Sequence, residues 1–155
     1  MILGNDYATA HRLTDGTEIW RVGGFNPNAQ GKYITSHRII SSPAAGGDIL
    51  VIPTCRDLDI FAMKPGAMGA LKPANPAELW RKPKGAPDVP TPLVHEGLVY
   101  LCGEFGMLRC WDGTSGNEYY SKQLHKIRYR ASPAISGGRI YLRGFEYLYA
   151  IQASK

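Results

Sequence analysis

The chain has 155 residues, 44% of them apolar and 20% charged, which is ordinary for a globular protein, but its 18 Gly and 11 Pro residues are too many for a helical one. We therefore expect an all-β chain of short strands and turns. The formal net charge of +5 is spread along the chain without a polybasic block, so we expect no nucleic-acid partner. The longest apolar run falls far short of the roughly twenty residues of a membrane-spanning helix, which predicts no transmembrane segment.

Alternating apolar residues, rich in β-branched and aromatic side chains, predict strands that come in pairs. The pairs lie at 49–53 and 58–63, at 98–102 and 107–111, and at 139–143 and 147–151. The strands of each pair are joined by a short polar or Gly-containing loop, as a hairpin requires. With a further tight turn on each side, the order within one unit is that of a four-stranded antiparallel meander.

A turn motif recurs along the chain, with a small residue, a Gly and an aromatic residue at fixed offsets. It is formed by Ala10, Gly16 and Trp20 and again by Cys110, Gly116 and Tyr120, while a looser copy runs from Ala62 to Trp80 and a truncated one surrounds Ala150. Because the unit recurs, we interpret it as architectural. The alternative, that the Asp and Gly-rich turn at 112–116 is a binding loop, is the weaker one.

A Ser-Pro or Thr-Pro dipeptide recurs out of phase with this turn. Its prolines are Pro43, Pro92 and Pro133, which lie 49 and 41 residues apart. Repeats of about forty to fifty residues without amphipathic helices are typical of four-stranded propeller blades. We expect this dipeptide near the end of each innermost strand and the aromatic residue of the turn motif on the outermost strand.

These repeats predict a β-propeller of four-stranded antiparallel blades, present as a partial ring of about three to four blades, since closed rings have about four to eight. We divide the single domain 1–155 into the end of one blade at 1–22, blades at 36–83 and 89–124, and an incomplete last blade at 128–152. We expect the chain to be the C-terminal part of a larger ring. Its open blade edges suggest missing N-terminal blades or self-association. Two Pro/Gly-rich insertions, at 23–33 and 65–78, are expected to be loops.

Two groups of residues are candidates for a defined role. Trp20, Trp80, Asp112, Gly116 and Tyr120 are expected to dock one blade against the next, with the aromatic rings as packing residues. Arg38, Arg128 and Arg130 lie on or just before innermost strands, where several guanidinium groups near the channel mouth would suit an acidic ligand or protein. The competing interpretation is that these arginines pair with carboxylates of neighbouring blades or reach into solvent.

The paired markers resemble the repeat of the pyrroloquinoline-quinone-like (PQQ-like) propeller family. Cys110, Asp112, Ser115, Gly116 and Tyr120 occupy the stations of its tryptophan docking motif, with Tyr in place of Trp. The resemblance covers nearly the whole chain and is nearest to the non-enzymatic bacterial repeat proteins and the outer-membrane assembly lipoproteins. It implies a periplasmic or exported protein, although the chain shows no signal peptide.

The resemblance also includes quinone-dependent dehydrogenases, which carry an adjacent Cys-Cys pair and a calcium site. Here Cys55, Cys102 and Cys110 are scattered, and no catalytic constellation involves the histidines. We therefore expect no enzyme activity, no metal and no cofactor, with the quinone itself unlikely. The favoured function is a non-catalytic scaffold that binds a protein or another ligand; the alternatives are a fragment of a quinone-dependent dehydrogenase and a propeller that binds carbohydrate or polyanion.

Overall fold

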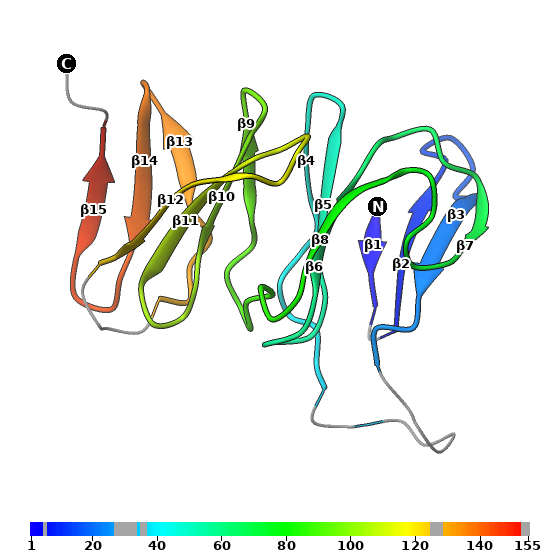
Figure 1. The fold of residues 1–155 in the computed structure, drawn as a ribbon, viewed down its shortest axis with the longest axis horizontal. Coiled ribbons are helices and arrows are strands. Elements are labelled where there is room, and N and C mark those ends of the chain that lie inside the picture. Colours follow the sequence, from blue (N-terminus) through cyan, green and yellow to red (C-terminus); the bar gives the residue numbers. More distant parts are fainter. Residues whose placement is uncertain (5, 27–33, 35–36, 125–128, 153–155) are drawn as a thin grey trace.

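The computed structural model describes residues 1–4, 6–26, 34, 37–124 and 129–152, and within them the chain is all-β. Four small sheets stand side by side along the long axis of the molecule (Figure 1). Among the described residues, no helix is long and apolar enough to cross a membrane. The described strands form no closed ring, so the number of propeller blades stays a prediction.

The second and third sheets are complete antiparallel meanders of four strands each. The second has the order β4 (Ala44–Gly46), β5 (Ile49–Pro53), β6 (Ile60–Met63) and β8 (Glu78–Lys82), and the third the order β9 (Leu93–His95), β10 (Leu98–Cys102), β11 (Met107–Asp112) and β12 (Glu118–Gln123). The fourth sheet has three strands, β13 (Ala134–Ser136), β14 (Arg139–Arg143) and β15 (Leu148–Ile151). All six strands predicted from the alternating pattern are confirmed, with ends that differ by two residues at most.

The first sheet contains β1 (Ile2–Leu3), β2 (Tyr7–His11) and β3 (Glu18–Gly23), and its fourth strand comes from elsewhere in the chain. This strand, β7 (Gly69–Leu71), leaves the second sheet and pairs with β3 in parallel, with Gly69 opposite Trp20. The expectation that 65–78 is only a loop is therefore wrong. The pairing partner is almost fifty residues away in the sequence. By pairing with β3, the strand satisfies backbone groups on the outer edge of a neighbouring sheet.

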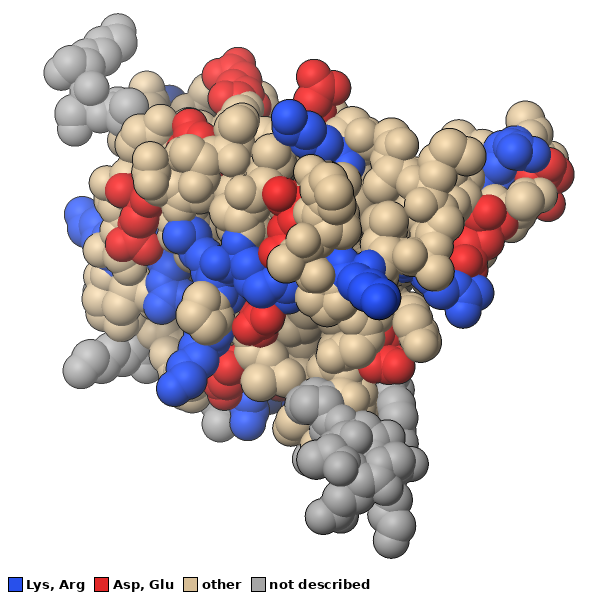
Figure 2. All heavy atoms as spheres, turned by 45° about the vertical axis from the view of Figure 1, so that its right-hand side comes forward, with Lys and Arg blue, Asp and Glu red and all other residues tan. Residues whose placement is uncertain are grey.

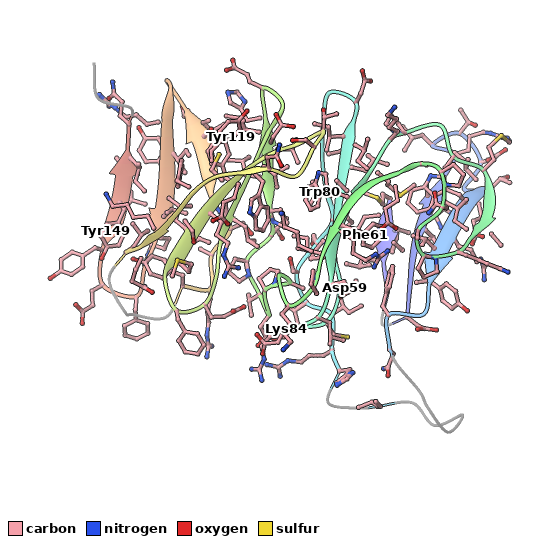
Figure 3. The ribbon with its side chains drawn as sticks, viewed as in Figure 1. Asp59, Phe61, Trp80, Lys84, Tyr119 and Tyr149 are labelled. Carbon is pink, nitrogen blue, oxygen red and sulfur yellow. The ribbon has the colours of Figure 1, made fainter. Side chains whose placement is uncertain are left out.

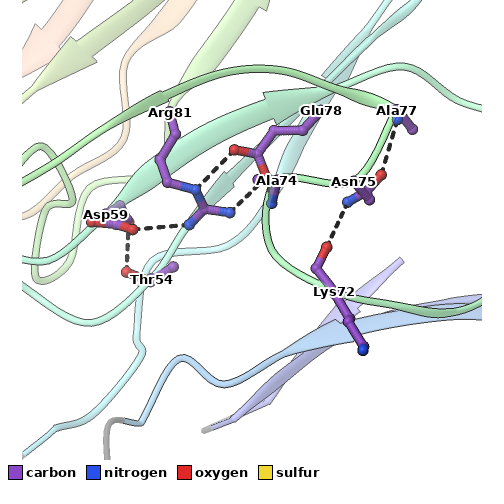
Figure 4. Close-up of polar contacts among 8 residues, drawn as sticks. All are labelled: Thr54, Asp59, Lys72, Ala74, Asn75, Ala77, Glu78 and Arg81. Carbon is purple, nitrogen blue, oxygen red and sulfur yellow. Dashed lines mark hydrogen bonds and ion pairs between the residues drawn. The ribbon is translucent and has the colours of Figure 1, made fainter.

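A network around Arg81 holds the return of this insertion to its own sheet (Figure 4). The Arg81 guanidinium donates to both oxygens of Glu78, at 2.7 and 2.8 Å, and to Asp59 Oδ2 at 2.9 Å. Glu78 Oε2 also accepts the backbone N–H of Ala74 at 3.0 Å. The same guanidinium lies 4.4 Å from the centre of the Phe61 ring, so charge, hydrogen bonds and packing fix the base of the insertion together. The other predicted insertion, 23–33, lies mostly outside the described residues.

Three apolar clusters fill the spaces between neighbouring sheets. Successive side chains of a strand point to opposite faces of its sheet, and strands with apolar residues at successive positions, such as β6, are buried on both faces between neighbouring sheets. The cluster between the second and third sheets includes Val51, Trp80, Val99 and Trp111, all buried. Comparable clusters lie between the first and second sheets and between the third and fourth. The core is thus divided into layers, and each layer depends on contact between two repeats.

The Ser/Thr-Pro dipeptides link the sheets through their hydroxyl groups. Each proline directly precedes the first strand of its sheet, not the end of that strand as the sequence suggested. The backbone N–H of Ser42 donates to Thr91 Oγ1 at 3.1 Å, and the backbone N–H of Thr91 donates to Ser132 Oγ at 3.0 Å. The hydroxyls of Thr91 and Ser132 therefore each accept a hydrogen bond from the same station of the preceding sheet.

Candidate functional site

Trp80 of β8 is seated on a turn of the third sheet. Its Nε1 donates to the carbonyl oxygen of Gly113 at 2.9 Å, and its ring meets Trp111 edge-on with the ring centres 5.9 Å apart. The side chain is only 9% exposed, and Figure 3 shows it between the second and third sheets. A Cβ atom at Gly116 would lie 2.7 Å from Trp80 Cγ. The seat therefore leaves no room for a side chain at position 116.

Asp112 shapes the turn on which Trp80 rests. Its Oδ1 accepts the backbone N–H groups of Thr114 and Ser115 at 3.0 and 2.7 Å and the Ser115 hydroxyl at 2.9 Å, while Tyr119 donates to Oδ2 at 3.2 Å. These hydrogen bonds favour the ionised carboxylate and lower the pKa of Asp112. Gly116 completes the turn with a φ of 73°, a conformation in which Cβ-bearing residues are strained.

The other two aromatic residues of the motif have different surroundings. Trp20 is 3% exposed and lies in the cluster with Ile52, Phe61 and Met63 of the second sheet. Tyr120 is 40% exposed and stands in a row with Tyr100 and Cys110 of its own sheet. By analogy with Trp80, Tyr120 would rest on the residues that follow β15, and of these 153–155 lie outside the described part of the chain. Its docking role stays a prediction.

A second constellation lies along the edge of the molecule that carries the β5–β6, β10–β11 and β14–β15 turns (Figure 1). It surrounds a hollow of about 580 Å³, which we call the arginine groove. The groove is lined by charged residues that come from three sheets, together with Ile40, Val89 and Phe105: Arg38, Arg56, Asp57, Asp88, Glu104 and Arg130. Segments of consecutive repeats thus place three arginines and three carboxylates at one site.

Asp88 is the centre of the groove. Arg38 forms a bidentate pair with it, with Nη2 to Oδ2 at 2.8 Å and Nε to Oδ1 at 3.2 Å. The Asp88 side chain is 10% exposed, and Arg56 Nη1 lies 4.0 Å from its Oδ2. Glu104 accepts the backbone N–H of Asp88 and, at 3.0 Å, that of Val89. The hydrogen bonds from Arg38 lower the pKa of Asp88. Burial acts in the opposite direction, and the nearby charges of Arg38, Arg56 and Arg130 lower the pKa further.

The three arginines proposed from the sequence therefore differ in their situation. Arg38 pairs with a carboxylate of the next sheet, which is the competing interpretation of the sequence and not a vacant anion site. Arg128 lies outside the described residues. Arg130 is exposed, and with the described part of the chain it forms no ion pair. The sequence reasoning missed Arg56, Asp88 and Glu104, whose roles depend on contacts between sheets.

The pKa of Asp88 predicts a pH dependence of stability. Its value in the folded protein is below the ordinary 3.8, so the ionised carboxylate stabilises the fold above that pH, and this contribution is lost as pH falls through the folded pKa. Between about pH 5 and pH 2 we expect the free energy of unfolding of the wild type to fall more steeply than that of Asp88→Asn, as measured by urea denaturation. The control is Asp57→Asn, at a side chain 81% exposed; equal slopes for the wild type and Asp88→Asn would contradict the pairing.

Among the described residues, no group of three or more His, Cys, Asp or Glu side chains is placed so that it could hold a metal ion. Cys55, Cys102 and Cys110 are buried free thiols. Burial raises the pKa of Cys102 to about 12, so this thiol is protonated and a poor nucleophile at neutral pH.

Figure 2 shows Lys and Arg side chains in a band across one face, with Asp and Glu interspersed. The groove is therefore distinguished from the rest of the surface by the arrangement of its side chains more than by its net charge.

Comparison with known proteins places this geometry in a family. A family model described as outer membrane protein assembly factor BamB matches residues 4–153. BamB from Moraxella catarrhalis superposes with a TM-score of 0.68 at 14% identity, over 97% of this chain and 42% of that one. The chain thus spans less than half the length of that relative.

A computationally designed protein, Ika4, superposes with a TM-score of 0.70 at 9% identity, over 99% of this chain and 84% of that one. At such identities the two likenesses show the fold alone. A search of curated proteins found no significant match. The match to the family model covers nearly the whole chain. The chain therefore belongs to the PQQ-like repeat family described as outer membrane protein assembly factor BamB.

Proposed function

We propose that this chain is part of a β-propeller of four-stranded blades and acts as a non-catalytic scaffold in outer membrane protein assembly. The description of the family names the process, and the periplasmic location is part of this proposal. The sheets supply a rigid support, because the layers between them are filled by buried apolar residues and linked by hydrogen bonds at both the Trp80 seat and the Ser/Thr-Pro stations. Such a support can present turns from several repeats to one partner.

The observation that carries this proposal is the edge that holds the arginine groove. Three sheets contribute charged side chains there, and Phe105, at the tip of the β10–β11 turn, is 70% exposed beside Arg130. Exposed aromatic and arginine side chains together are typical of residues that dominate protein interfaces. We interpret this edge as the surface that meets the partner.

The chemistry of the groove favours binding over catalysis. Asp88 is committed to Arg38, and its lowered pKa makes it a weak base. Glu104 is committed to two backbone N–H groups. A general base needs a pKa near the working pH and a position within reach of the proton that it removes. Both carboxylates instead hold the connection between β8 and β9, since Asp88 lies in it and Glu104 accepts two of its backbone N–H groups.

Site-specific photocrosslinking in the cells that produce the protein tests this function. We expect a photoreactive phenylalanine analogue at Phe105 to crosslink an outer membrane protein or another component of its assembly. The matched control is the same analogue at Leu13, which is fully exposed in the β2–β3 turn at the opposite end of the sheets. There we expect no such product.

Two outcomes contradict the proposal. Crosslinking at Phe105 only to cytoplasmic proteins would exclude the assembly role. Equal yields of the same product at Phe105 and Leu13 would mean that the groove edge is not the interacting surface.

A further inference from the structure

A second hollow lies beside the arginine groove and has a different charge. Its volume is about 420 Å³, and it is lined by Arg130, Ala131, Arg143, Gly144 and Phe145. Both arginines are exposed, and neither forms an ion pair with any described residue. In contrast to the groove, where Asp57, Asp88 and Glu104 oppose the arginines, the described lining of this hollow contains no carboxylate. Its positive charge therefore stays uncompensated by its own walls.

The two hollows are adjacent, because Arg130 lines both. Each also has an exposed phenylalanine at its rim: Phe105 is 70% exposed and Phe145 is 84% exposed. The two phenylalanines occupy the same station of the repeat, five residues before Cys110 and Ala150 respectively, at the tips of the β10–β11 and β14–β15 turns. The surface therefore combines two phenylalanines and two arginines, Phe105, Arg130, Phe145 and Arg143, from two adjacent sheets.

The chemistry of this surface specifies a ligand. Guanidinium groups without a carboxylate partner favour an anion, and they bind carboxylates in a bidentate manner. Two exposed phenylalanines leave apolar area in water, which is unfavourable until an apolar group covers it. An inorganic anion would use only the arginines. A peptide segment with acidic and apolar residues in turn would use all four side chains.

We propose that this surface binds an acidic peptide segment of a partner protein, with its carboxylates on Arg130 and Arg143 and its apolar side chains against Phe105 and Phe145. The inference rests on the proposed function as a scaffold, and it names the chemical class of the segment that the scaffold holds. Because two sheets present the four side chains, the bound segment runs from the β10–β11 turn to the β14–β15 turn.

A binding titration tests the proposal with the purified chain. A fluorescein-labelled peptide of alternating Glu and Leu is followed by fluorescence anisotropy, next to a peptide of equal length that alternates Glu and Ser. We expect saturable binding of the Glu/Leu peptide, weaker binding of the Glu/Ser peptide, and loss of affinity for both as salt is added.

Three variants assign the binding to the named side chains. Replacing both arginines, Arg130→Gln with Arg143→Gln, is expected to weaken binding of the Glu/Leu peptide by at least about tenfold, since each removes a charge-assisted contact. Phe145→Ser is expected to reduce the preference for the Glu/Leu peptide over the Glu/Ser peptide, since Phe105 remains. The matched control is Arg139→Gln, on the same strand as Arg143 but at its other end, where Arg139 donates to Gln152 at 2.8 Å. This control should bind like the wild type.

Each contrary result overturns the inference. Absence of saturable binding to the Glu/Leu peptide would do so, as would equal affinity for the two peptides or equal losses in the double variant and Arg139→Gln. Tighter binding of inorganic phosphate or heparin than of either peptide would mean that the surface binds an inorganic anion or a polyanion and not a peptide. None of these results would change the crosslinks formed at Phe105, so failure here is distinguishable from failure of the proposed function.

Discussion

Trp80→Ala is expected to lower the free energy of unfolding by about 3–5 kcal/mol, because it removes a buried aromatic side chain and leaves a cavity. The lost ring is the one that packs against Trp111 and donates to Gly113 of the third sheet. For a chain of this size the loss corresponds to a fall in Tm of roughly 10 °C. Urea denaturation followed by circular dichroism measures the effect.

The control is Tyr120→Ala at the same station of the next sheet. Tyr120 is 40% exposed, so its truncation is expected to cost about 1 kcal/mol or less. A similar cost for the two variants would show that the Trp80 seat contributes no more than an ordinary surface contact. It would contradict the idea that the second and third sheets are held together there.

Gly116→Ala is expected to destabilise the fold more than Gly16→Ala, although both glycines have a φ of 73°. The two substitutions share the strain of an alanine in this conformation, about 1–2 kcal/mol. Only at Gly116 does the new Cβ meet a neighbour, Trp80 Cγ at 2.7 Å; at Gly16 nothing lies within 4 Å. Overpacking adds a further cost of about 1–3 kcal/mol.

The difference between the two glycine variants, measured by chemical denaturation, isolates the contact between sheets from the strain of the backbone. Equal losses of stability would mean that Trp80 moves aside freely. In that case the turn at Asp112 to Gly116 would be a local structure only, without a docking role.

The strands and turns could be predicted from the sequence because their signals are local. Alternating apolar residues predicted six strands, and Gly16 and Gly116 marked turns that require a positive φ. The recurrence of the turn motif showed that the chain is built from repeats, and the family comparison agrees. Each strand, turn and motif copy lies within about twenty residues of sequence, and the repeats are recognised when the copies are compared.

The remaining features depend on how the sheets are arranged, and short stretches of sequence carry no signal for them. Strand β7 has only three residues, and its partner β3 is far away in the chain. Asp88 lies fifty residues from Arg38, so its pairing follows only once the second and third sheets are placed side by side. Arg38 therefore resembled a vacant anion site until its carboxylate was located.

One signal was present in the sequence but was assigned to the wrong cause. The recurring Ser/Thr-Pro dipeptide was explained by the proline, which lacks an N–H group and is tolerated at strand ends. The structure assigns a role to the residue before it, since the hydroxyls of Thr91 and Ser132 accept backbone N–H groups from the preceding sheet. In other chains built from such repeats, a Ser or Thr at the same position of successive repeats predicts hydrogen bonds between neighbouring sheets.

A double-mutant cycle between Trp80→Ala and Gly116→Ala tests the docking of the second sheet on the third most directly. With the indole removed, the alanine at position 116 no longer meets the ring and only the Cβ at position 80 stays near, at 3.0 Å, so its cost should fall towards that of Gly16→Ala. We expect a coupling free energy of about 1–3 kcal/mol between the two sites. Additive losses of stability would show that the two residues do not meet, and would contradict the account of how these repeats are joined.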